Sequence, residues 1–125
     1  MSRKILIVED SKTYMALAVS VLKRAGFEVL KSETIWISRV VNQHKPDLVL
    51  MDVSVGGCKG TSAVSALRKC RFGQELKVIL HSSEPGHILS KMAAECGADG
   101  YVEKDGCCAN LVKTVKQKLG MMHVA

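Results

Sequence analysis

Five side chains that could do chemistry each lie at or next to the end of a short apolar run. They are Glu9, Asp10, Asp52, Ser82 and Lys104. Carboxylates packed within a few ångströms of one another repel, so a cation or a proton must relieve part of their charge. Oxygen ligands without sulfur or imidazole favour Mg²⁺ or a similar hard ion. Mg²⁺ commonly uses one or two carboxylates, which leaves a third carboxylate free to act as a nucleophile.

A free aspartate in such a site suits phosphoryl transfer. An aspartate carboxylate that attacks a phosphoryl donor forms an aspartyl phosphate. A metal ion, an ammonium and a hydroxyl would stabilise the charge on the transferring group. This chemistry requires the five side chains, which are scattered in sequence, to meet in one pocket.

The spacing of apolar residues predicts strands that alternate with helices. We expect strands at 4–8, 28–32, 48–52, 77–81 and 100–103, and helical segments at 11–25, 35–43, 61–70, 88–96 and around 111–119. This alternation predicts an α/β fold made of right-handed βαβ units, with a doubly wound parallel sheet. The segments 4–8 and 48–52 are apolar at nearly every residue, as buried central strands must be. The segment 28–32 alternates and is expected nearer an edge.

A parallel sheet would bring the candidate residues together. Its functional crevice lies at the carboxyl ends of the strands, which is where all five of them stand. A length of 125 residues favours one domain, because two cores would each bury little surface. We assign residues 1–125 to a single domain with its core at about 4–119. Residues 120–125 read as a trailing tail or the start of a linker.

Composition excludes several other classes of protein. The chain is 47% hydrophobic and 24% charged, as ordinary soluble domains are. Its apolar runs are far shorter than the roughly 18 residues of a membrane helix, and none matches the apolar core of about 7 to 15 residues in a signal peptide. We therefore expect a cytoplasmic protein with no membrane contact. The cysteines lack paired spacing and are interpreted as free thiols, while a redox or metal role for Cys107 and Cys108 stays open.

Four stretches, in order and with matching spacing, resemble the receiver domain of two-component response regulators, including single-domain chemotaxis-type regulators. The stretches are ILIVEDS (5–11), DLVLMD (47–52), VILHSS (78–83) and GADGYVEK (97–104). The resemblance covers the chain from about residue 4 to 119. It implies a flavodoxin-like (βα)5 fold, a doubly wound five-stranded parallel sheet with strand order 2-1-3-4-5.

The resemblance also implies roles for the metal and phosphoryl site. Asp52 would be the phosphoacceptor. Glu9 and Asp10 would bind Mg²⁺ together with Asp52, and the backbone carbonyl of Ser54 would supply a further ligand. Lys104 would pair with the phosphoryl oxygens.

The family's switch maps onto two more positions. Ser82 would be the hydroxyl that binds the phosphoryl group, and Tyr101 would be the aromatic side chain that swings inward when Ser82 moves. The implied output surface for a downstream effector consists of the fourth helix, the fifth strand and the fifth helix, and phosphorylation could create a homodimer. The phosphoryl donor would be a sensor histidine kinase or a phosphotransfer protein. Such a module is not an enzyme beyond self-catalysed phosphotransfer to Asp52 and slow autodephosphorylation.

Two positions depart from the family pattern. Val55 and Gly56 stand where the family usually has Met-Pro, and Gly57 follows, so we expect a mobile loop over 54–60. Asp105 stands where the family often has a proline on a cis bond. We expect a trans bond there, with Asp105 capping the last helix.

Three other functions stay open beside the phosphorylated receiver. A degenerate receiver would be a non-phosphorylated protein-interaction module. An aspartyl-phosphate phosphatase would place Asp-x-Asp after the first strand, and this chain has Glu9 and Asp10 there. Nucleic-acid binding would use the net charge of +6 and the basic residues between Lys59 and Lys77, but no helix-turn-helix pattern accompanies them. A solvated basic face is the simpler interpretation.

Structural interpretations remain for the other polar and aromatic positions. The four histidines show no ligand spacing and are interpreted as surface or turn residues; they are His44, His81, His87 and His123. The sequence does not decide whether Trp36 packs or is exposed.

Overall fold

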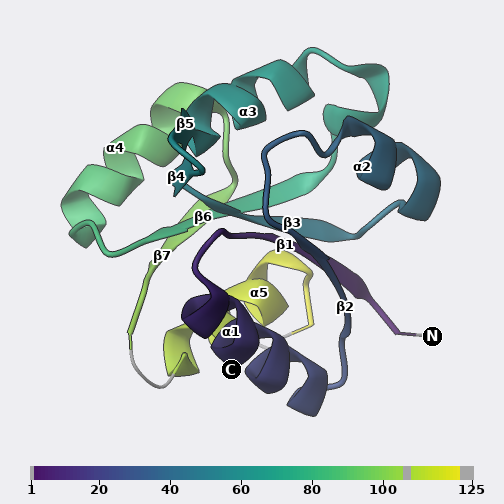
Figure 1. The fold of residues 1–125 in the computed structure, drawn as a ribbon, viewed down its shortest axis with the longest axis vertical. Coiled ribbons are helices and arrows are strands. Elements are labelled where there is room, and N and C mark those ends of the chain that lie inside the picture. Colours follow the sequence, from purple (N-terminus) through teal and green to yellow (C-terminus); the bar gives the residue numbers. More distant parts are fainter. Residues whose placement is uncertain (1, 106–107, 122–125) are drawn as a thin grey trace.

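Five strands form one parallel sheet in the computed structural model of the chain, which describes residues 2–105 and 108–121. The strands are β1 (Lys4–Val8), β2 (Glu28–Ser32), β3 (Leu48–Asp52), β6 (Lys77–Ser82) and β7 (Gly100–Glu103). Their order is β2-β1-β3-β6-β7, and neighbours pair in parallel (Figure 1). Numbered within this sheet alone, the order is 2-1-3-4-5. The predicted strands and the implied flavodoxin-like topology are therefore confirmed.

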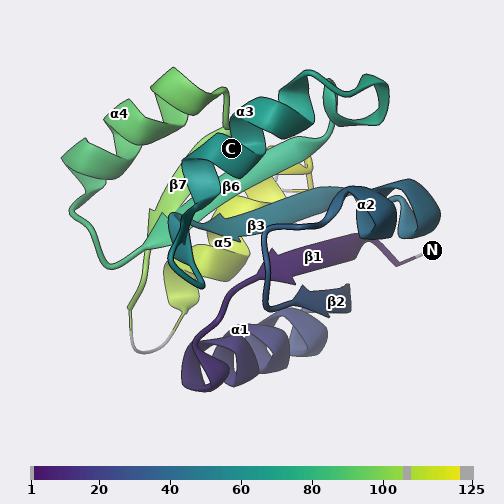
Figure 2. The ribbon, with the colours of Figure 1, turned by 45° about the horizontal axis from the view of Figure 1, so that its top comes forward.

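Helices cover both faces of the sheet, as the alternation predicted. Figures 1 and 2 show α1 (Lys12–Arg24) and α5 (Ala109–Lys118) on one face. The opposite face carries α2 (Ser38–His44), α3 (Gly60–Arg68) and α4 (Gly86–Cys96), with a short 3-10 turn at Arg71–Gly73 after α3. The second helix begins three residues later than the predicted 35, which leaves Trp36 outside it.

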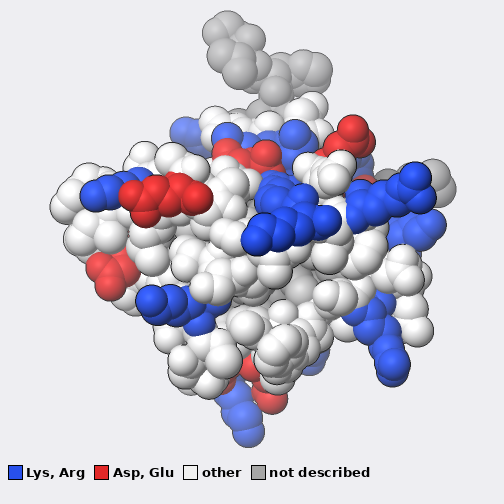
Figure 3. All heavy atoms as spheres, turned by 90° about the horizontal axis from the view of Figure 1, so that it is seen from above, with Lys and Arg blue, Asp and Glu red and all other residues white. Residues whose placement is uncertain are grey.

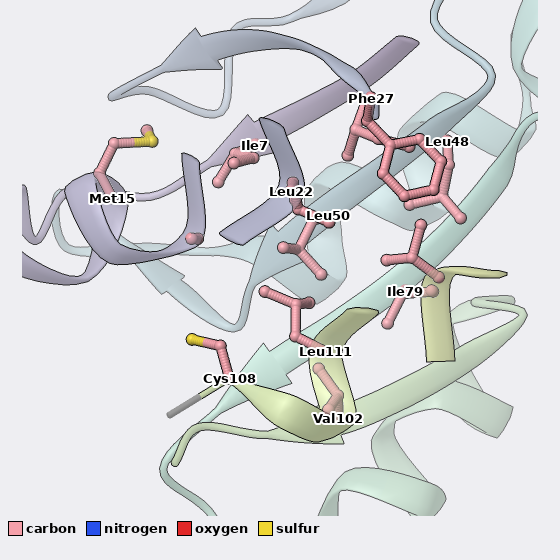
Figure 4. Packing of buried hydrophobic residues seen from close by; sticks show 13 residues of the cluster. Ile7, Met15, Leu22, Phe27, Leu48, Leu50, Ile79, Val102, Cys108 and Leu111 are labelled. Carbon is pink, nitrogen blue, oxygen red and sulfur yellow. The ribbon is translucent and has the colours of Figure 1, made fainter. Parts of the chain in front are cut away.

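Two apolar clusters fill the space between the sheet and its helix layers. The cluster beneath α1 and α5 includes Ile5, Ile7, Leu22, Leu50 and Leu111 (Figure 4). The cluster beneath α2, α3 and α4 includes Leu6, Val8, Val49, Met51 and Leu80. Successive side chains of a strand point to opposite faces, so β1 and β3 contribute to both clusters. Each fully buried Leu or Ile contributes about 1.5–3 kcal/mol, which holds the strand ends in fixed register.

The first helix begins and ends as its sequence predicted. The Oγ atom of Ser11 accepts a hydrogen bond from the backbone N–H of Tyr14 at 3.2 Å. At the other end Gly26 has φ +99°, a conformation that other residues rarely adopt. The Ser11 cap fixes the position at which the chain leaves β1 and enters α1, directly beside the candidate acidic residues, and Gly26 marks the end of α1.

The segment expected to be a mobile loop is a β-hairpin. Strands β4 (Ser54–Val55) and β5 (Cys58–Lys59) pair antiparallel. Gly56 and Gly57, with φ +56° and +80°, make the two-residue turn between them. Positive φ at both positions is what a type I′ hairpin turn requires, so the glycines build a regular turn here.

The peptide bond between Lys104 and Asp105 is trans, as expected. None of the peptide bonds among the described residues is cis. A side-chain oxygen of Asp105 accepts a hydrogen bond from the backbone N–H of Cys108, the residue that precedes α5. Asp105 therefore contributes to the start of the last helix, although Cys108 is the capping residue itself.

Two further expectations concern helix length and cysteines. Among the described helices, none combines the length and apolar character needed to cross a bilayer. Cys58, Cys70 and Cys96 carry free thiols, as expected. Cys107 and His123 lie outside the described residues.

Candidate functional site

Three carboxylates meet at the carboxyl edge of the sheet, where β1 and β3 end. One oxygen from each of Glu9, Asp10 and Asp52 lies within 4.8 Å of the other two. Glu9 and Asp52 are 1% and 6% exposed, whereas Asp10 is open to solvent. The parallel strands thus bring together residues more than forty positions apart, as predicted.

Glu9 is held from three sides although it is buried. Its backbone N–H donates to the carbonyl of Ser32 at 3.0 Å, which extends the pairing of β1 with β2. Its Oε2 atom accepts the backbone N–H of Ser11 at 2.9 Å. Its Oε1 atom lies 2.6 Å from Nζ of Lys104. A buried carboxylate needs such partners, because desolvation without them is costly.

Asp52 stands at the end of β3, directly beneath the start of α3. Its Oδ1 atom accepts the backbone N–H of Ser54 at 3.4 Å, and its Oδ2 atom lies 3.1 Å from Nζ of Lys104. A Cβ atom added to Gly60 would lie 1.8 Å from the carbonyl oxygen of Asp52. Only glycine permits this close approach, so Gly60 sets how near α3 comes to the candidate nucleophile.

Lys104 reaches the pocket from the end of β7. Its backbone N–H donates to the carbonyl of Ser82 at 2.8 Å, which fixes the stem of the side chain. Its Nζ atom lies between Glu9 and Asp52 and 4.5 Å from the centre of the Tyr14 ring, a cation–π distance. Burial by itself would lower the pKa of Lys104, but the two carboxylates raise it above its usual value. The side chain is therefore a fixed positive charge.

The charge of the pocket fits a divalent cation. The three carboxylates and one ammonium carry a net charge of −2, and the acidic oxygens are close enough to share one ion. Asp10 is exposed, so an ion bound there would keep water ligands, as Mg²⁺ prefers. The Oδ2 atom of Asp10 accepts the N–H of Gly56 at 2.7 Å, which holds this carboxylate against the hairpin. Ser54, the candidate carbonyl ligand, lies in the same hairpin.

The two candidate switch residues lie on adjacent strands. Ser82 is 6% exposed at the end of β6, and its Oγ atom accepts the N–H of Glu84 at 3.2 Å. Tyr101 on β7 is 39% exposed, and its ring faces Gly86 at the start of α4. The structure therefore shows the tyrosine outside the pocket.

The interpretation of His81 as a surface or turn residue is wrong. His81 is fully buried in β6, and its Nε2 atom lies 3.5 Å from the carbonyl of Val8 and 4.0 Å from Oε1 of Glu9. Burial and the nearby Lys104 charge lower the pKa of His81 to about 4. The imidazole is therefore neutral at pH 7 and adds no charge to the pocket.

Sequence reasoning missed two contacts of the site. Tyr14 packs on α1 against both His81, with ring centres 5.3 Å apart, and Lys104. No local pattern marks such a contact between distant elements. The bond from Gly56 to Asp10 was also missed, although the Gly-Gly pair is a recognised signal of a hairpin turn.

Comparisons with known proteins agree with this geometry. The response regulator receiver domain family matches residues 5–116. Protein PilH of Pseudomonas aeruginosa is 32% identical over 120 residues, which cover 93% of this chain and 97% of PilH. Adventurous-gliding motility protein Z of Myxococcus xanthus is 32% identical over 105 residues, which cover 82% of this chain and only 8% of that protein.

A solved structure shows the same fold. The chemotaxis response regulator CheY4 of Vibrio cholerae superimposes with a TM-score of 0.86 at 21% identity, covering 94% of this chain and 99% of CheY4. The match to the family along nearly the whole chain and the near-complete overlap with PilH agree with the order of the acidic, hydroxyl and lysine positions. The chain belongs to the receiver domain family of response regulators.

Proposed function

We propose that residues 1–125 form a single receiver domain, which accepts a phosphoryl group on Asp52 and switches a partner-binding surface. The observation that carries this proposal is the cluster in which Glu9, Asp10 and Asp52 place oxygens within 4.8 Å of one another, with Lys104 between two of them. The donor would be a sensor histidine kinase or a phosphotransfer protein. A cytoplasmic location agrees with such a donor.

Asp52 would act as the nucleophile. One carboxylate oxygen of Asp52 forms a bond to phosphorus while the bond from phosphorus to the donor's leaving group breaks and that group departs with the electron pair. Glu9, Asp10, Asp52 and the carbonyl of Ser54 would hold Mg²⁺, which when bound supplies charge stabilisation to the phosphoryl oxygens. Lys104, whose pKa is raised, supplies a further fixed positive charge.

Ser82 and Tyr101 would transmit the phosphorylation of Asp52 to the partner-binding surface. A phosphoryl oxygen on Asp52 offers Ser82 a stronger hydrogen-bond acceptor than it has in this structure, where its oxygen accepts the N–H of Glu84. Movement of Ser82 toward Asp52 would free space into which the half-exposed Tyr101 ring can turn. This ring motion would alter the face formed by α4, β7 and α5.

A cavity on that face supports its role as the output surface. It has a volume of about 520 Å³ and lies between β7 and α5, with Tyr101, Lys104 and Asp105 among its lining residues. Residues of the phosphorylation pocket and of the outer face therefore line one hollow. A downstream effector, or a second copy after phosphorylation, would bind there.

The decisive experiment is labelling with acetyl phosphate, read by intact mass and peptide mapping. With Mg²⁺ present, we expect an increase of one phosphoryl group at Asp52. The matched variants are Asp52→Asn, which should take up none, and Asp99→Asn, which changes a carboxylate outside the pocket and should label normally. If the wild type takes up nothing under conditions that modify a control receiver, phosphorylation is excluded.

Titration with Mg²⁺ tests the same pocket without a donor. Trp36 lies away from the site, so its fluorescence is a poor readout of ion binding. The amide NMR resonances of Asp10 and Gly56 are the better readout. Saturation in the millimolar range is expected of a working site. If the pocket does not bind Mg²⁺, the chain would instead be a degenerate receiver that binds partners without phosphorylation.

A further inference from the structure

The structure exposes its single tryptophan on the face opposite α1 and α5. Trp36 is 79% exposed, and the sequence contains no other tryptophan. A tryptophan left in water contributes little to folding, whereas buried tryptophans are prominent among the residues that dominate protein interfaces.

The backbone around Trp36 is firmly held, so the exposure of its ring does not come from a loose loop. The Oγ1 atom of Thr34 accepts the N–H of Trp36 at 3.3 Å, and Ser32 Oγ accepts the N–H of Thr34 at 3.2 Å. On the other side Ile37 is buried at 3% exposure and anchors the chain in the core. The ring is therefore displayed from a pre-organised position, which reduces the entropy lost on binding.

An apolar groove of about 270 Å³ lies beside the ring, between the chain before α2 and the side of α3. Its lining residues are Ile35, Trp36, Ile37, Ser38, Ser62, Ala63, Ala66, Leu67 and Cys70. Ile37 and Leu67 are buried, while Ala66 is exposed. Small alanines along α3 leave room for an aliphatic or aromatic side chain from a partner.

Basic residues stand next to the groove's lining residues along the chain, and the acidic residues Glu33, Asp47 and Glu75 lie just beyond the two segments that build it. The segments 34–46 and 58–74 that build it contain Arg39, Lys45, Lys59, Arg68, Lys69 and Arg71 and no acidic residue. The guanidinium of Arg68 already binds Asp99 and the carbonyls of Gly97 and Gly73, so we do not count it among the charges offered to a partner. Arg39, Lys69 and Arg71 are exposed. Figure 3 shows the molecule from above, with Lys and Arg side chains across its middle and right and Asp and Glu side chains at its left, top and lower edge.

We propose that this groove is a second docking surface, for a protein segment that inserts an apolar anchor beside Trp36 and surrounds it with acidic residues. The positive rim opposes a second copy of the chain, because two such faces would repel. The aliphatic lining suits a side chain better than a nucleic-acid base. The site uses neither Asp52 nor the face formed by α4, β7 and α5, so it would act beside the phosphorylation-controlled surface.

The single tryptophan makes the test direct. The probe is a synthetic peptide with a Leu and a Phe one helical turn apart, flanked on both sides by glutamates. We expect a saturable blue shift of Trp36 emission that weakens as salt is added. A peptide with lysines in place of the glutamates, and one with serines in place of Leu and Phe, should give no shift.

Variants then assign the site. Arg39→Glu combined with Lys69→Glu should weaken binding about tenfold or more, through charge. Ala66→Gln should weaken it by filling the groove, and since Ala66 is exposed the fold should tolerate the change. Lys23→Glu combined with Arg24→Glu makes the same charge change at exposed positions of α1, behind the sheet, and should leave the affinity unchanged.

Four results would overturn the proposal. They are an unchanged emission spectrum at millimolar peptide, equal binding of the serine peptide, displacement of the peptide by a single-stranded oligonucleotide that quenches Trp36, and a blue shift that appears with protein concentration alone. The third would assign the face to nucleic acid and the fourth to a second copy of the chain.

Discussion

Lys104 and Glu9 form the shortest ion pair among the described residues, with 2.6 Å between Nζ and Oε1. The distance from the same ammonium to Asp52 is longer, at 3.1 Å. In this state the lysine chiefly neutralises a buried carboxylate that is not the candidate nucleophile. A phosphoryl group on Asp52 would compete for the ammonium, so the pair links the buried acid to the phosphorylation state.

Replacing Lys104 should therefore destabilise the protein before any phosphorylation. In Lys104→Met, Glu9 keeps its burial and loses its cation, which should lower the free energy of unfolding by about 3 kcal/mol. Mg²⁺ should restore part of this loss, because it supplies charge to the same cluster. Urea unfolding with EDTA and with Mg²⁺ measures both effects. Lys113→Met, an exposed lysine of α5, should cost almost nothing; equal losses in the two variants would contradict the pairing.

His81 should make stability depend on pH. Its pKa is lowered from 6.5 to about 4 in the folded protein, so the unfolded chain binds the proton more tightly. Stability should therefore fall as the pH decreases from about 6.5 to about 4, by up to roughly 3 kcal/mol from this group. Urea midpoints across this range measure the slope.

His81→Leu should remove that contribution, whereas His87→Gln, at an exposed position, should keep it. A slope that is unchanged in His81→Leu would assign the pH dependence to other groups. The leucine variant should be as stable as the wild type at pH 7, because the buried imidazole is neutral there.

Gly60 should tolerate no side chain. The Cβ atom of Gly60→Ala would lie 1.8 Å from the Asp52 carbonyl oxygen, so α3 must move away from β3, at a cost of about 1–3 kcal/mol or more. Gly86→Ala is the matched control, since it also changes the first residue of a helix. The nearest atom to its Cβ would be a side-chain oxygen of Glu103 at 2.6 Å, which can rotate away, and a carbon of the Tyr101 ring would lie at an ordinary contact distance of 3.7 Å. Thermal unfolding should separate the two variants clearly, and equal melting temperatures would refute the close contact.

The bond between Gly56 and Asp10 should report ion binding. An ion held by Asp10 changes the acceptor of the Gly56 N–H, so this amide resonance should move as Mg²⁺ is added. The amide resonance of Gly97, at the end of α4, should not shift. In Asp10→Asn the Gly56 response should be lost. A Gly56 amide that does not respond in a wild type that binds Mg²⁺ would show that Asp10 is not a ligand.

The fold could be predicted because its signals are local. Each central strand is a short apolar run, and glycine or a capping serine marks helix ends such as those at Ser11 and Gly26. The meeting of Glu9, Asp10 and Asp52 also followed, since the carboxyl ends of parallel strands share one edge. These inferences needed only periodicity and topology.

The remaining features depend on contacts between distant elements. Successive side chains of a strand point to opposite faces, so His81 and Ser82 lie on different faces of β6, but nothing local showed that Tyr14 and Glu9 would cover His81. The Gly56-Gly57 pair was interpreted as loss of restraint, while the positive φ of both residues completes a hairpin. The exposure of Trp36 follows from the late start of α2, and helix boundaries are the least certain part of a sequence pattern.

The order of the pocket's residues along the chain has a consequence for biosynthesis. Glu9, Asp10 and Asp52 leave the ribosome well before Lys104, and β7, which carries the lysine into place, is the last of the five strands to be synthesised. A nascent chain would therefore hold its acidic cluster without the ammonium that neutralises it. Cellular Mg²⁺ would be the available counterion during that interval, so its concentration should influence how efficiently newly made chains reach the native state.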